Sequence, residues 1–315
     1  MSHDSVSDSA ISAHFSAAPA RVFRAEKGTL YVLATPLGNL RDITLRALDI
    51  LSTADLILVE DTRVSAKLLS HYGIKAPLRA LHEHNERKSI AAIIALLQQN
   101  HSIALISDAG TPAVSDPGAR LVAAVRAATL PIVPIPGACA LIAAVSAAGL
   151  NAEHFYFAGF LPTATKARRA QLETLNALDA ALIFYEAPHR IRRTLGELIQ
   201  AFQTPREIII ARELTKTFET IERIPLADAA DWLDAHPDTE RGELVLIIDT
   251  SADATPRNTT TDAAASDATL KRWLPALLKE LPPARAAKVA AQATGIPRSA
   301  IYERIEGEKD KVKRT

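Results

Sequence analysis

The chain has 315 residues, and 48% of them are hydrophobic, which is enough for one or two buried cores, so we expect two globular domains. The formal net charge is zero, so the overall charge gives no indication of a nucleic-acid partner. The charge is uneven, however: residues 270–315 hold 11 Lys and Arg against 5 Asp and Glu, and the rest hold 25 against 31. The basic C-terminal segment therefore allows an anionic partner at that end of the chain.

The cysteine content and the apolar runs limit where the protein works. Cys139 is the only cysteine, which excludes an intramolecular disulfide, fits a reducing compartment and gives no support to a metal site of the Cys/His type. Residues 1–20 lack the basic and apolar segments of a signal peptide, and we expect a disordered tail over 1–27. No run approaches the roughly 18 apolar residues of a membrane helix. We expect a cytoplasmic protein with no membrane contact.

Residues 28–150 alternate short branched runs with amphipathic stretches. Strands are predicted at 30–34, 56–59, 103–106 and 132–135, and helices at 45–51, 64–72, 90–99 and 119–128. Gly73 and Gly149 follow helical patterns, where a glycine with positive φ often ends a helix, and Asp42 is placed to cap the helix at 45–51. The alternation is typical of βαβ units and predicts a mostly parallel sheet in an N-terminal α/β domain.

A second, smaller α/β domain is predicted for residues 151–249, with strands at 155–160, 182–185, 208–211 and 244–249 and helices at 166–178 and 191–202. Residues 250–269 contain no Leu, Ile, Val, Met or aromatic residue, and they are predicted to be a flexible linker. Residues 270–315 form a basic helical segment, in which 287–302 read as helix, glycine turn and helix. This pattern fits a nucleic-acid-binding helix-turn-helix or a plain helical hairpin, and the sequence leaves both open.

The segment 107–118, SDAGTPAVSDPG, follows the predicted strand at 103–106 and combines turn residues with carboxylates. A loop at the carboxyl end of a parallel strand is where open α/β sheets bind ligands. Gly110 lets the backbone approach a ligand closely, the prolines stiffen the loop, and Asp108 offers acceptors to hydroxyls or a cation. The alternative is a rigid connection without a ligand.

Glycine turns also follow the strands at 30–34 and 132–135, in TPLGNLRDIT and IPGACA. Neither has the spacing G-x-G-x-x-G, so a nicotinamide-dependent dehydrogenase is disfavoured, although EDTR after the strand at 56–59 imitates a ribose-binding carboxylate. Three loops at one edge of the sheet therefore share small residues and tight turns.

Taken together, several segments resemble the tetrapyrrole methylase superfamily, and within it the methyltransferases of small-subunit ribosomal RNA. They are TPLGNLRDIT, EDTR, LHEHNE, SDAGTPAVSDPG, PGACALIAAVSAAGL, FYEAPHR, ARELTKTFE and RGELVLII. The resemblance covers residues 28 to 249 and, more weakly, the C-terminal helical segment. It implies a two-domain class III methyltransferase of α/β fold, usually a homodimer. Such an enzyme binds S-adenosylmethionine between its domains and methylates the 2′-oxygen of a cytidine in 16S rRNA.

The resemblance also implies a cofactor site formed by Leu37, Ile106, Ser107, Asp108, Thr111, Cys139, Ala140, Tyr185 and Gly242. We expect Asp108 to accept hydrogen bonds from the amino group or the ribose hydroxyls of the cofactor. Glycine turns at Gly38, Gly110 and Gly137 would let the backbone come close to it. Cys139 is also compatible with a purely structural, small apolar role.

Transfer to a ribose hydroxyl needs alignment of the attacking oxygen and removal of its proton. The candidate catalytic side chains are Glu60, Asp61, His82 and Glu186, with His84 as a second histidine, and the sequence does not choose among them. The candidate RNA-binding side chains are Arg63, Lys166, Arg168, Arg169, Arg190 and Arg212. The alternative is that these residues form salt bridges within loops or lie on solvated helix faces and do not bind RNA.

Two other functions stay open at this point. A C-methyltransferase of tetrapyrrole precursors would use the same loops, although a small macrocycle does not need the basic C-terminal helices. A non-catalytic nucleic-acid-binding protein would use those helices and would not bind S-adenosylmethionine.

Overall fold

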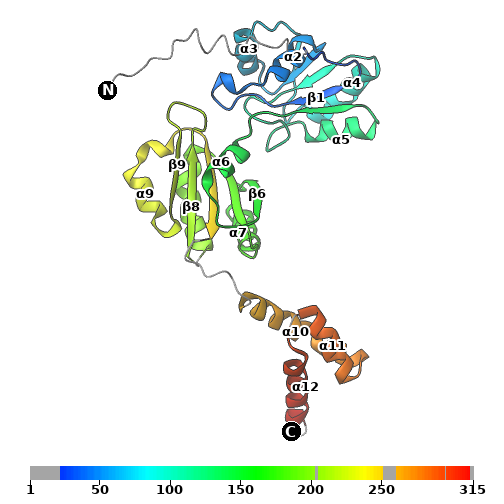
Figure 1. The fold of residues 1–315 in the computed structure, drawn as a ribbon, viewed down its shortest axis with the longest axis vertical. Helices are drawn as coiled ribbons and strands as arrows, with labels where there is room; N and C mark the ends of the chain where they lie inside the picture. Colours follow the sequence, from blue (N-terminus) through cyan, green and yellow to red (C-terminus); the bar gives the residue numbers. More distant parts are fainter. Residues whose placement is uncertain (1–21, 203–204, 251–259, 295, 313–315) are drawn as a thin grey trace, which may run out of the picture. The chain divides into compact units, whose positions relative to one another are not determined.

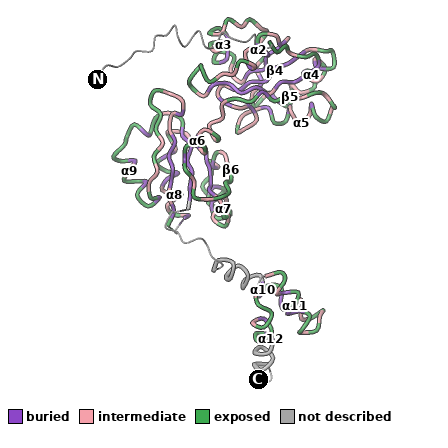
Figure 2. Tube along the Cα trace, viewed as in Figure 1, coloured by how far each residue is buried: buried purple, intermediate pink, exposed green. Residues whose placement is uncertain are grey.

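The computed structural model describes residues 22–202, 205–250, 260–294 and 296–312. The chain forms two compact units that divide after Ser251, and the first unit contains two sheets of five strands each (Figure 1). Buried residues run along the strands of both sheets (Figure 2). Among the described helices, none is long and apolar enough to cross a membrane.

The first sheet is parallel throughout, as the alternating pattern predicts. Its strands are β1 (Leu30–Leu33), β2 (Leu56–Val59), β3 (Leu78–Ala80), β4 (Ile103–Leu105) and β5 (Ile132–Ile135), in the order β3-β2-β4-β1-β5. Alternate residues face opposite sides: one side packs against α2 (Leu45–Thr53) and α3 (Thr62–His71), the other against α4 (Glu86–Gln98) and α5 (Ala119–Ala127). Because both faces are covered, β2 and β4 are buried at every residue.

Details at the ends of these elements differ from the sequence-based expectation. The sequence does not predict β3, because three residues around the exposed Arg79 give no strand pattern. The cap of α2 is Thr44, whose side chain accepts the Ala47 N–H at 3.2 Å, and Asp42 lies instead in the short 3₁₀ helix η1 (Leu40–Asp42). Gly73 and Gly149 have the expected positive φ.

The tail predicted for 1–27 is too long at its C-terminal end. Residues 1–21 lie outside the described ranges, but the Ala25 N–H donates to Thr53 Oγ1 at 2.9 Å, and the Lys27 ammonium pairs with Asp55 at 2.7 Å. These bonds attach the segment 22–27 to the end of α2.

The second sheet is mixed. Its strands are β6 (Phe155–Phe160), β7 (Ala181–Glu186), β8 (Arg206–Arg212), β9 (Thr220–Pro225) and β10 (Leu244–Thr250), in the order β6-β7-β10-β8-β9, and only β6 and β7 are parallel. On one face lie α7 (Thr165–Asn176), α8 (Ile191–Ala201) and α9 (Ala229–Ala235), and on the other lies α6 (Ala140–Ala148). The connections include η2 (Pro188–Arg190), η3 (Leu226–Asp228) and η4 (Pro237–Glu240).

Two features of the second domain depart from the prediction. The sequence predicts neither β9 nor α9, because β9 is a half-exposed edge strand and α9 has only seven residues. Helix α6 falls inside the first domain predicted for 28–150, yet Ala144 and Ala148 share a core with Ile183, Ile209 and Ile247 of the second sheet. The small side chains of α6 allow it to lie close to these strands.

The second unit consists of α10 (Thr260–Glu280), α11 (Pro283–Thr294) and α12 (Arg298–Val312). Leu270, Leu274, Ala287, Ile301 and Ile305 lie in its core. Helix α10 begins within the segment predicted as a linker to residue 269, because alanine has the highest helix propensity. Residues 251–259 and Gly295 lie outside the described ranges.

Candidate active site

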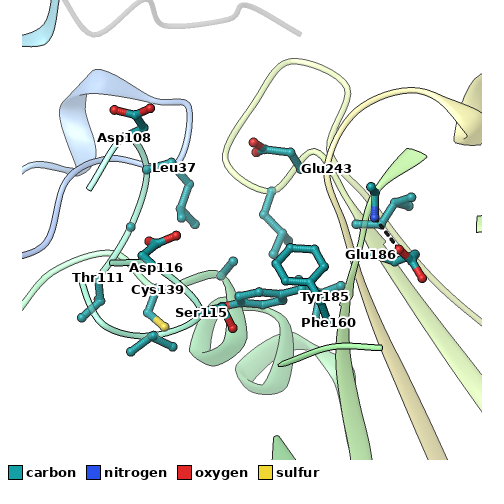
Figure 3. Close-up of a pocket in the computed structure, with 18 of the residues that line it drawn as sticks. Leu37, Asp108, Thr111, Ser115, Asp116, Cys139, Phe160, Tyr185, Glu186 and Glu243 are labelled. Atoms are coloured by element: carbon teal, nitrogen blue, oxygen red, sulfur yellow. Dashed lines mark hydrogen bonds between the residues drawn. The ribbon is translucent and has the colours of Figure 1, made fainter. Parts of the chain in front are cut away.

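A pocket of about 420 Å³ is lined by residues from both sheets of the first unit (Figure 3). One wall consists of residues that follow strands of the parallel sheet: Leu37 after β1, Glu60 after β2, Asp108 to Thr111 and Val114 to Asp116 after β4, and Cys139 and Ala140 after β5. These loops meet because the carboxyl ends of parallel strands lie at one edge of a sheet. The loops after β1, β4 and β5, which the sequence pattern predicts to lie at one edge of the sheet, therefore form part of one pocket wall.

The second wall is a row of side chains across four strands of the mixed sheet. Phe160, Tyr185, Val245 and Ala211 stand opposite one another on β6, β7, β10 and β8, and all four line the pocket. The Tyr185 ring meets the Phe160 ring edge to face, with 5.7 Å between centroids. This row gives the pocket an apolar, aromatic surface opposite the loops.

The Tyr185 hydroxyl joins the two walls. It accepts the N–H of Leu141, in the first turn of α6, at 3.0 Å, and so satisfies a helix donor that has no partner within the helix. Burial, together with the neighbouring Cys139, raises the Tyr185 pKa above its usual value. The phenol therefore stays neutral and fixes the start of α6, where Cys139 and Ala140 enter the pocket.

Hydrogen bonds tie the loop after β4 to the neighbouring loops. Thr35 and Gly110 exchange backbone hydrogen bonds of 2.8 and 3.0 Å, and the Thr111 hydroxyl donates to the Ala138 carbonyl at 3.0 Å. Gly110 has a φ of +79°, and a Cβ on it would lie 3.1 Å from Leu37 Cδ2. The close approach predicted at Gly110 is thus a contact with the β1 loop, which shapes the pocket wall.

Four carboxylates, Glu60, Asp108, Asp116 and Glu243, gather at the pocket. Burial raises the pKa of Glu60 and of Asp108, and the repulsion between neighbouring carboxylates adds to it. The Asp108 carboxylate also accepts the Asp61 N–H at 3.1 Å. Among the described residues that line the pocket, none is a lysine or an arginine. The pocket therefore favours a cationic ligand.

Glu186 lines the pocket, but its carboxylate turns away from the other acidic groups (Figure 3). It accepts the Thr194 hydroxyl at 2.5 Å and the Ala187 N–H at 2.8 Å, and it pairs with Arg190 at 3.1 Å. Its side chain is only 1% exposed. Its oxygens are thus engaged inside the second domain, and the catalytic role of Glu186 stays a prediction that this geometry does not favour.

Two other predicted catalytic residues lie outside the pocket lining. Asp61 caps α3 by accepting the Arg63 N–H at 2.8 Å, and the same carboxylate pairs with the Arg63 guanidinium at 2.6 Å. This pairing lowers the Asp61 pKa to about 2. His82 is close enough to Glu60 to oppose the rise of the Glu60 pKa, and its Nδ1 is buried without a hydrogen-bond partner among the described residues.

Five of the residues predicted to bind the cofactor do not line the pocket: Gly38, Ile106, Ser107, Gly137 and Gly242. Ile106 is buried in the first core, and the Ser107 hydroxyl donates to the Gly110 carbonyl at 3.1 Å. The three glycines give room to neighbours, because a Cβ on Gly38, Gly137 or Gly242 would collide with Lys216, Ala34 or Glu213, respectively. The other seven, namely Leu37, Asp108, Gly110, Thr111, Cys139, Ala140 and Tyr185, line the pocket.

Arg168 does not fit the RNA-binding role predicted for it. Its side chain is 1% exposed, it pairs with Glu197, and it donates to the Pro162 carbonyl at 2.7 Å. Arg190 is also turned inward, since it donates to the Leu161 carbonyl at 2.6 Å as well as pairing with Glu186. Arg212 donates to the Arg241 carbonyl at 2.8 Å.

The remaining candidates, Lys166, Arg169 and Arg63, have exposed side chains. Of these, Arg63 pairs with Asp61.

The sequence did not single out several residues of the pocket, above all Asp116, Glu243, Phe160, Leu244 and Val245. Asp116 and Glu243 lie in the segments SDPG and RGEL, so a carboxylate one or two residues from a glycine is the signal that could have found them. The position of Val245 depends on the antiparallel register with β7 and β8, which no local pattern specifies.

The two sheets and the pocket that both of them line define the class of protein, a two-domain α/β protein with a small-molecule site. The family model described as Tetrapyrrole (Corrin/Porphyrin) Methylases matches residues 29–230, and the model described as RsmI C-terminal HTH domain matches residues 264–307. The chain therefore belongs to the tetrapyrrole methylase family, and within it to the ribosomal RNA small subunit methyltransferase I group. It is a methyltransferase whose cofactor is S-adenosylmethionine.

Proteins named Ribosomal RNA small subunit methyltransferase I are similar to the chain over most of its length. The protein from Pseudomonas aeruginosa is 45% identical over 88% of this chain and 96% of its own length. The protein from Xylella fastidiosa is 47% identical over 87% and 98%, and that from Escherichia coli O157:H7 is 43% identical over 88% and 94%.

Solved structures share the fold of the first unit. The cobalt precorrin-4 methyltransferase CbiF has a TM-score of 0.51 at 17% identity and covers 70% of this chain and 94% of its own. The methyltransferase CobJ has a TM-score of 0.53 at 20% identity, with 71% and 95% covered.

Proposed function

We propose that the protein transfers a methyl group from S-adenosylmethionine to the ribose 2′-oxygen of a cytidine in 16S rRNA of the small ribosomal subunit. The observation that carries the proposal is the similarity to the curated relatives. The eight compared here are 42–47% identical to the chain and match it over 90–98% of their own length. This similarity spans the pocket and the C-terminal helices together.

The residues of the pocket fit the cofactor. S-adenosylmethionine supplies a methyl group made electrophilic by a positively charged sulfur. Asp108 and Glu243 offer negative charge to that sulfur and to the cofactor's amino group, while Leu37 and Val245 offer apolar surface. The cavity of about 420 Å³ lies in the usual size range of small-molecule sites. The carboxylates bind the cation, and the apolar walls exclude water from the reacting atoms.

We further propose that the enzyme works as a homodimer in the cytoplasm, where small ribosomal subunits are found. Lys166 and Arg169 of α7 and Arg63 of α3 are the cations proposed to contact RNA phosphates, since their side chains are exposed. The alternative of a tetrapyrrole substrate rests on the family name alone and leaves the C-terminal helices without a role.

Mapping of 2′-O-methyl groups on 16S rRNA by mass spectrometry tests the proposal. Cells that lack the protein should lose one cytidine methylation, and cells that regain it should recover that methylation. Purified protein should transfer a labelled methyl group from S-adenosylmethionine to small subunits isolated from the deficient cells. No change at any ribose would contradict the proposed reaction, and no binding of S-adenosylmethionine in calorimetry would contradict the assignment as an enzyme.

The double variant Lys166→Glu with Arg169→Glu should weaken capture of small subunits without changing cofactor affinity. Loss of two phosphate contacts lowers binding by about tenfold or more and reduces the slope of log affinity against log salt by about 1.5. Filter binding at several salt concentrations measures both quantities. Arg87→Glu with Lys88→Glu on α4 makes the same charge change on another exposed face and serves as the control. Equal weakening by both pairs would show that α7 has no particular role.

A further inference from the structure

Asp116 is a pocket residue held in place by a strained loop. Ala113 and Ser115, just before it, have φ values of +66°, and Gly118, just after it, has a φ of +122°. Left-handed backbone at residues with a side chain is strained and persists only where surrounding contacts enforce it. Such strain concentrates at functional sites, and the group that this loop presents to the pocket is Asp116.

Buried contacts on the first-domain side enforce the loop conformation. Glu86, which is 4% exposed, accepts the N–H groups of Gly118 and Leu121 at 3.2 and 3.0 Å through one carboxylate oxygen. A Cβ on Gly118 would lie 2.7 Å from Leu105 Cδ2, so the loop returns to the sheet in close contact with β4. These contacts fix the end of the loop that follows Asp116.

The second domain makes room for the same loop. Strand β6 has an irregularity between Phe157 and Gly159, and a Cβ on Gly159, where φ is +66°, would lie 3.3 Å from the Ser115 hydroxyl oxygen. Bulges of this kind often stand next to active sites, where they re-aim the chain. Ser115 therefore meets β6 directly, and the residue that follows it is Asp116, whose carboxylate lies at the pocket beside Cys139 (Figure 3).

We propose that Asp116 is the proton acceptor of the methyl transfer, a role that rests on the function proposed above. The ribose oxygen forms a bond to the methyl carbon, and the carbon–sulfur bond breaks with its electron pair staying on sulfur. The hydroxyl proton passes to a carboxylate oxygen of Asp116 and from there to water after product release. Charge balances, because a sulfonium and a carboxylate become a neutral thioether and a neutral carboxylic acid.

The surroundings of Asp116 suit this role. Burial raises its pKa to about 6, and repulsion from Glu60, Asp108 and Glu243 adds to the shift, while a hydrogen bond with Ser107 opposes it. Tyr185 faces the same group from β7 and stays neutral. A carboxylate with a pKa near 6 is ionised at neutral pH and is a stronger base than an ordinary one. Glu186 is already engaged, and Asp108 already accepts a backbone N–H, so neither competes as well for the role.

The test compares Asp116→Asn, Asp116→Glu and the exposed control Asp231→Asn on α9. Single-turnover methylation of small subunits from deficient cells is measured from pH 5 to 9, and S-adenosylmethionine affinity is measured by calorimetry. Asp116→Asn should slow transfer by about 100-fold or more with unchanged affinity. The wild-type rate should fall tenfold per pH unit below about 6, where Asp116 becomes protonated, and this limb should vanish in Asp116→Asn. Asp116→Glu should restore part of the rate, and Asp231→Asn should match wild type.

A second readout does not depend on activity. Because the folded-state pKa is raised, Asp116 adds stability only at low pH, and this contribution is lost as the pH rises through about 4 to 6. Asp116→Asn should therefore melt a few degrees above wild type at pH 7.5, and the difference should shrink towards zero at pH 4. A melting difference independent of pH would contradict the titration.

Three outcomes would overturn either the role proposed for Asp116 or the function on which that role rests. A full rate in Asp116→Asn at saturating cofactor overturns the proposal. Weakened cofactor binding with a normal saturated rate also overturns it and makes Asp116 a binding residue. If the wild-type protein methylates no ribose, the proposed function fails, and this is seen before any variant is compared.

Discussion

Gly110→Val should remove detectable binding of S-adenosylmethionine while leaving the protein folded. The backbone at Gly110 has a φ of +79°, and an added Cβ lies 3.1 Å from Leu37 Cδ2 before the branched methyl groups are counted. Gly110 and Leu37 both line the pocket, so the new side chain must displace Leu37 or distort the pairing of Gly110 with Thr35. A displacement of about 1 Å in a binding wall is enough to cost 100-fold in function. Calorimetry with S-adenosylmethionine measures the loss.

Gly73→Val is the matched control, because Gly73 has a φ of +67° and a Cβ on it meets nothing within 4 Å. Both substitutions carry the same backbone strain, on the order of 1–2 kcal/mol, and the contact with Leu37 adds to it only at Gly110. Only the change at Gly110 alters the pocket. If Gly73→Val weakens cofactor binding equally, general destabilisation is responsible, and the contact between Gly110 and Leu37 has no special importance.

The edge of the sheet that carries Leu37, Asp108 and Cys139 was predictable from the strand pattern, whereas on the opposite wall only Tyr185 was expected, and that from the family resemblance alone. Parallel strands place all their following loops at one edge, so recognising the βαβ rhythm is enough to bring distant segments together. In the mixed sheet the facing row forms only because β10 lies antiparallel between β7 and β8. That arrangement depends on non-local pairing, and a one-residue slip would turn Val245 to the other face.

Arg168 and Glu186 show why a charged residue in a motif is not a site by itself. In the segment KARR, Arg168 looks like its exposed neighbours Lys166 and Arg169, yet it is four and seven residues before the buried Leu172 and Leu175. That helical spacing is a signal that Arg168 lies on the buried face of the helix, although it does not specify Glu197 as the partner. For Glu186 no such signal exists, because the donors that hold its carboxylate come from the folded chain around it.

Asp249→Ala should be among the most destabilising substitutions in the protein, lowering the free energy of unfolding of the first unit by about 3 kcal/mol or more. Asp249 is completely buried, and its carboxylate accepts the N–H groups of Asn151 and Ala152 at 2.7 and 3.1 Å. It also pairs with Arg223 at 3.1 Å. Alanine would leave these donors and one side of the Arg223 guanidinium without their acceptor at a partly buried place, where an unpaired polar group is costly.

The substitution Asp249→Ala should also disturb the pocket, through helix α6. Arg223 donates to the carbonyls of Ala148 and Gly149 at 3.1 and 2.7 Å, so the group that Asp249 holds also clamps the C-terminal end of this helix. The other end of α6 is fixed by Tyr185 and presents Cys139 and Ala140 to the pocket. A helix released at one end transmits the change to the other, because its own hydrogen bonds keep it rigid. We therefore expect weaker cofactor binding in addition to lower stability.

Urea denaturation followed by circular dichroism, with and without saturating S-adenosylmethionine, measures both effects. Asp234→Ala is the control, because it removes an exposed carboxylate from a pair with Arg192 in which the side chains are 65% and 54% exposed, and such pairs contribute little. It should leave the midpoint unchanged. Added cofactor should raise the midpoint of Asp249→Ala less than that of wild type, since the stabilisation by a ligand follows its affinity. Equal shifts in the two proteins would show that α6 stays in place without its C-terminal clamp.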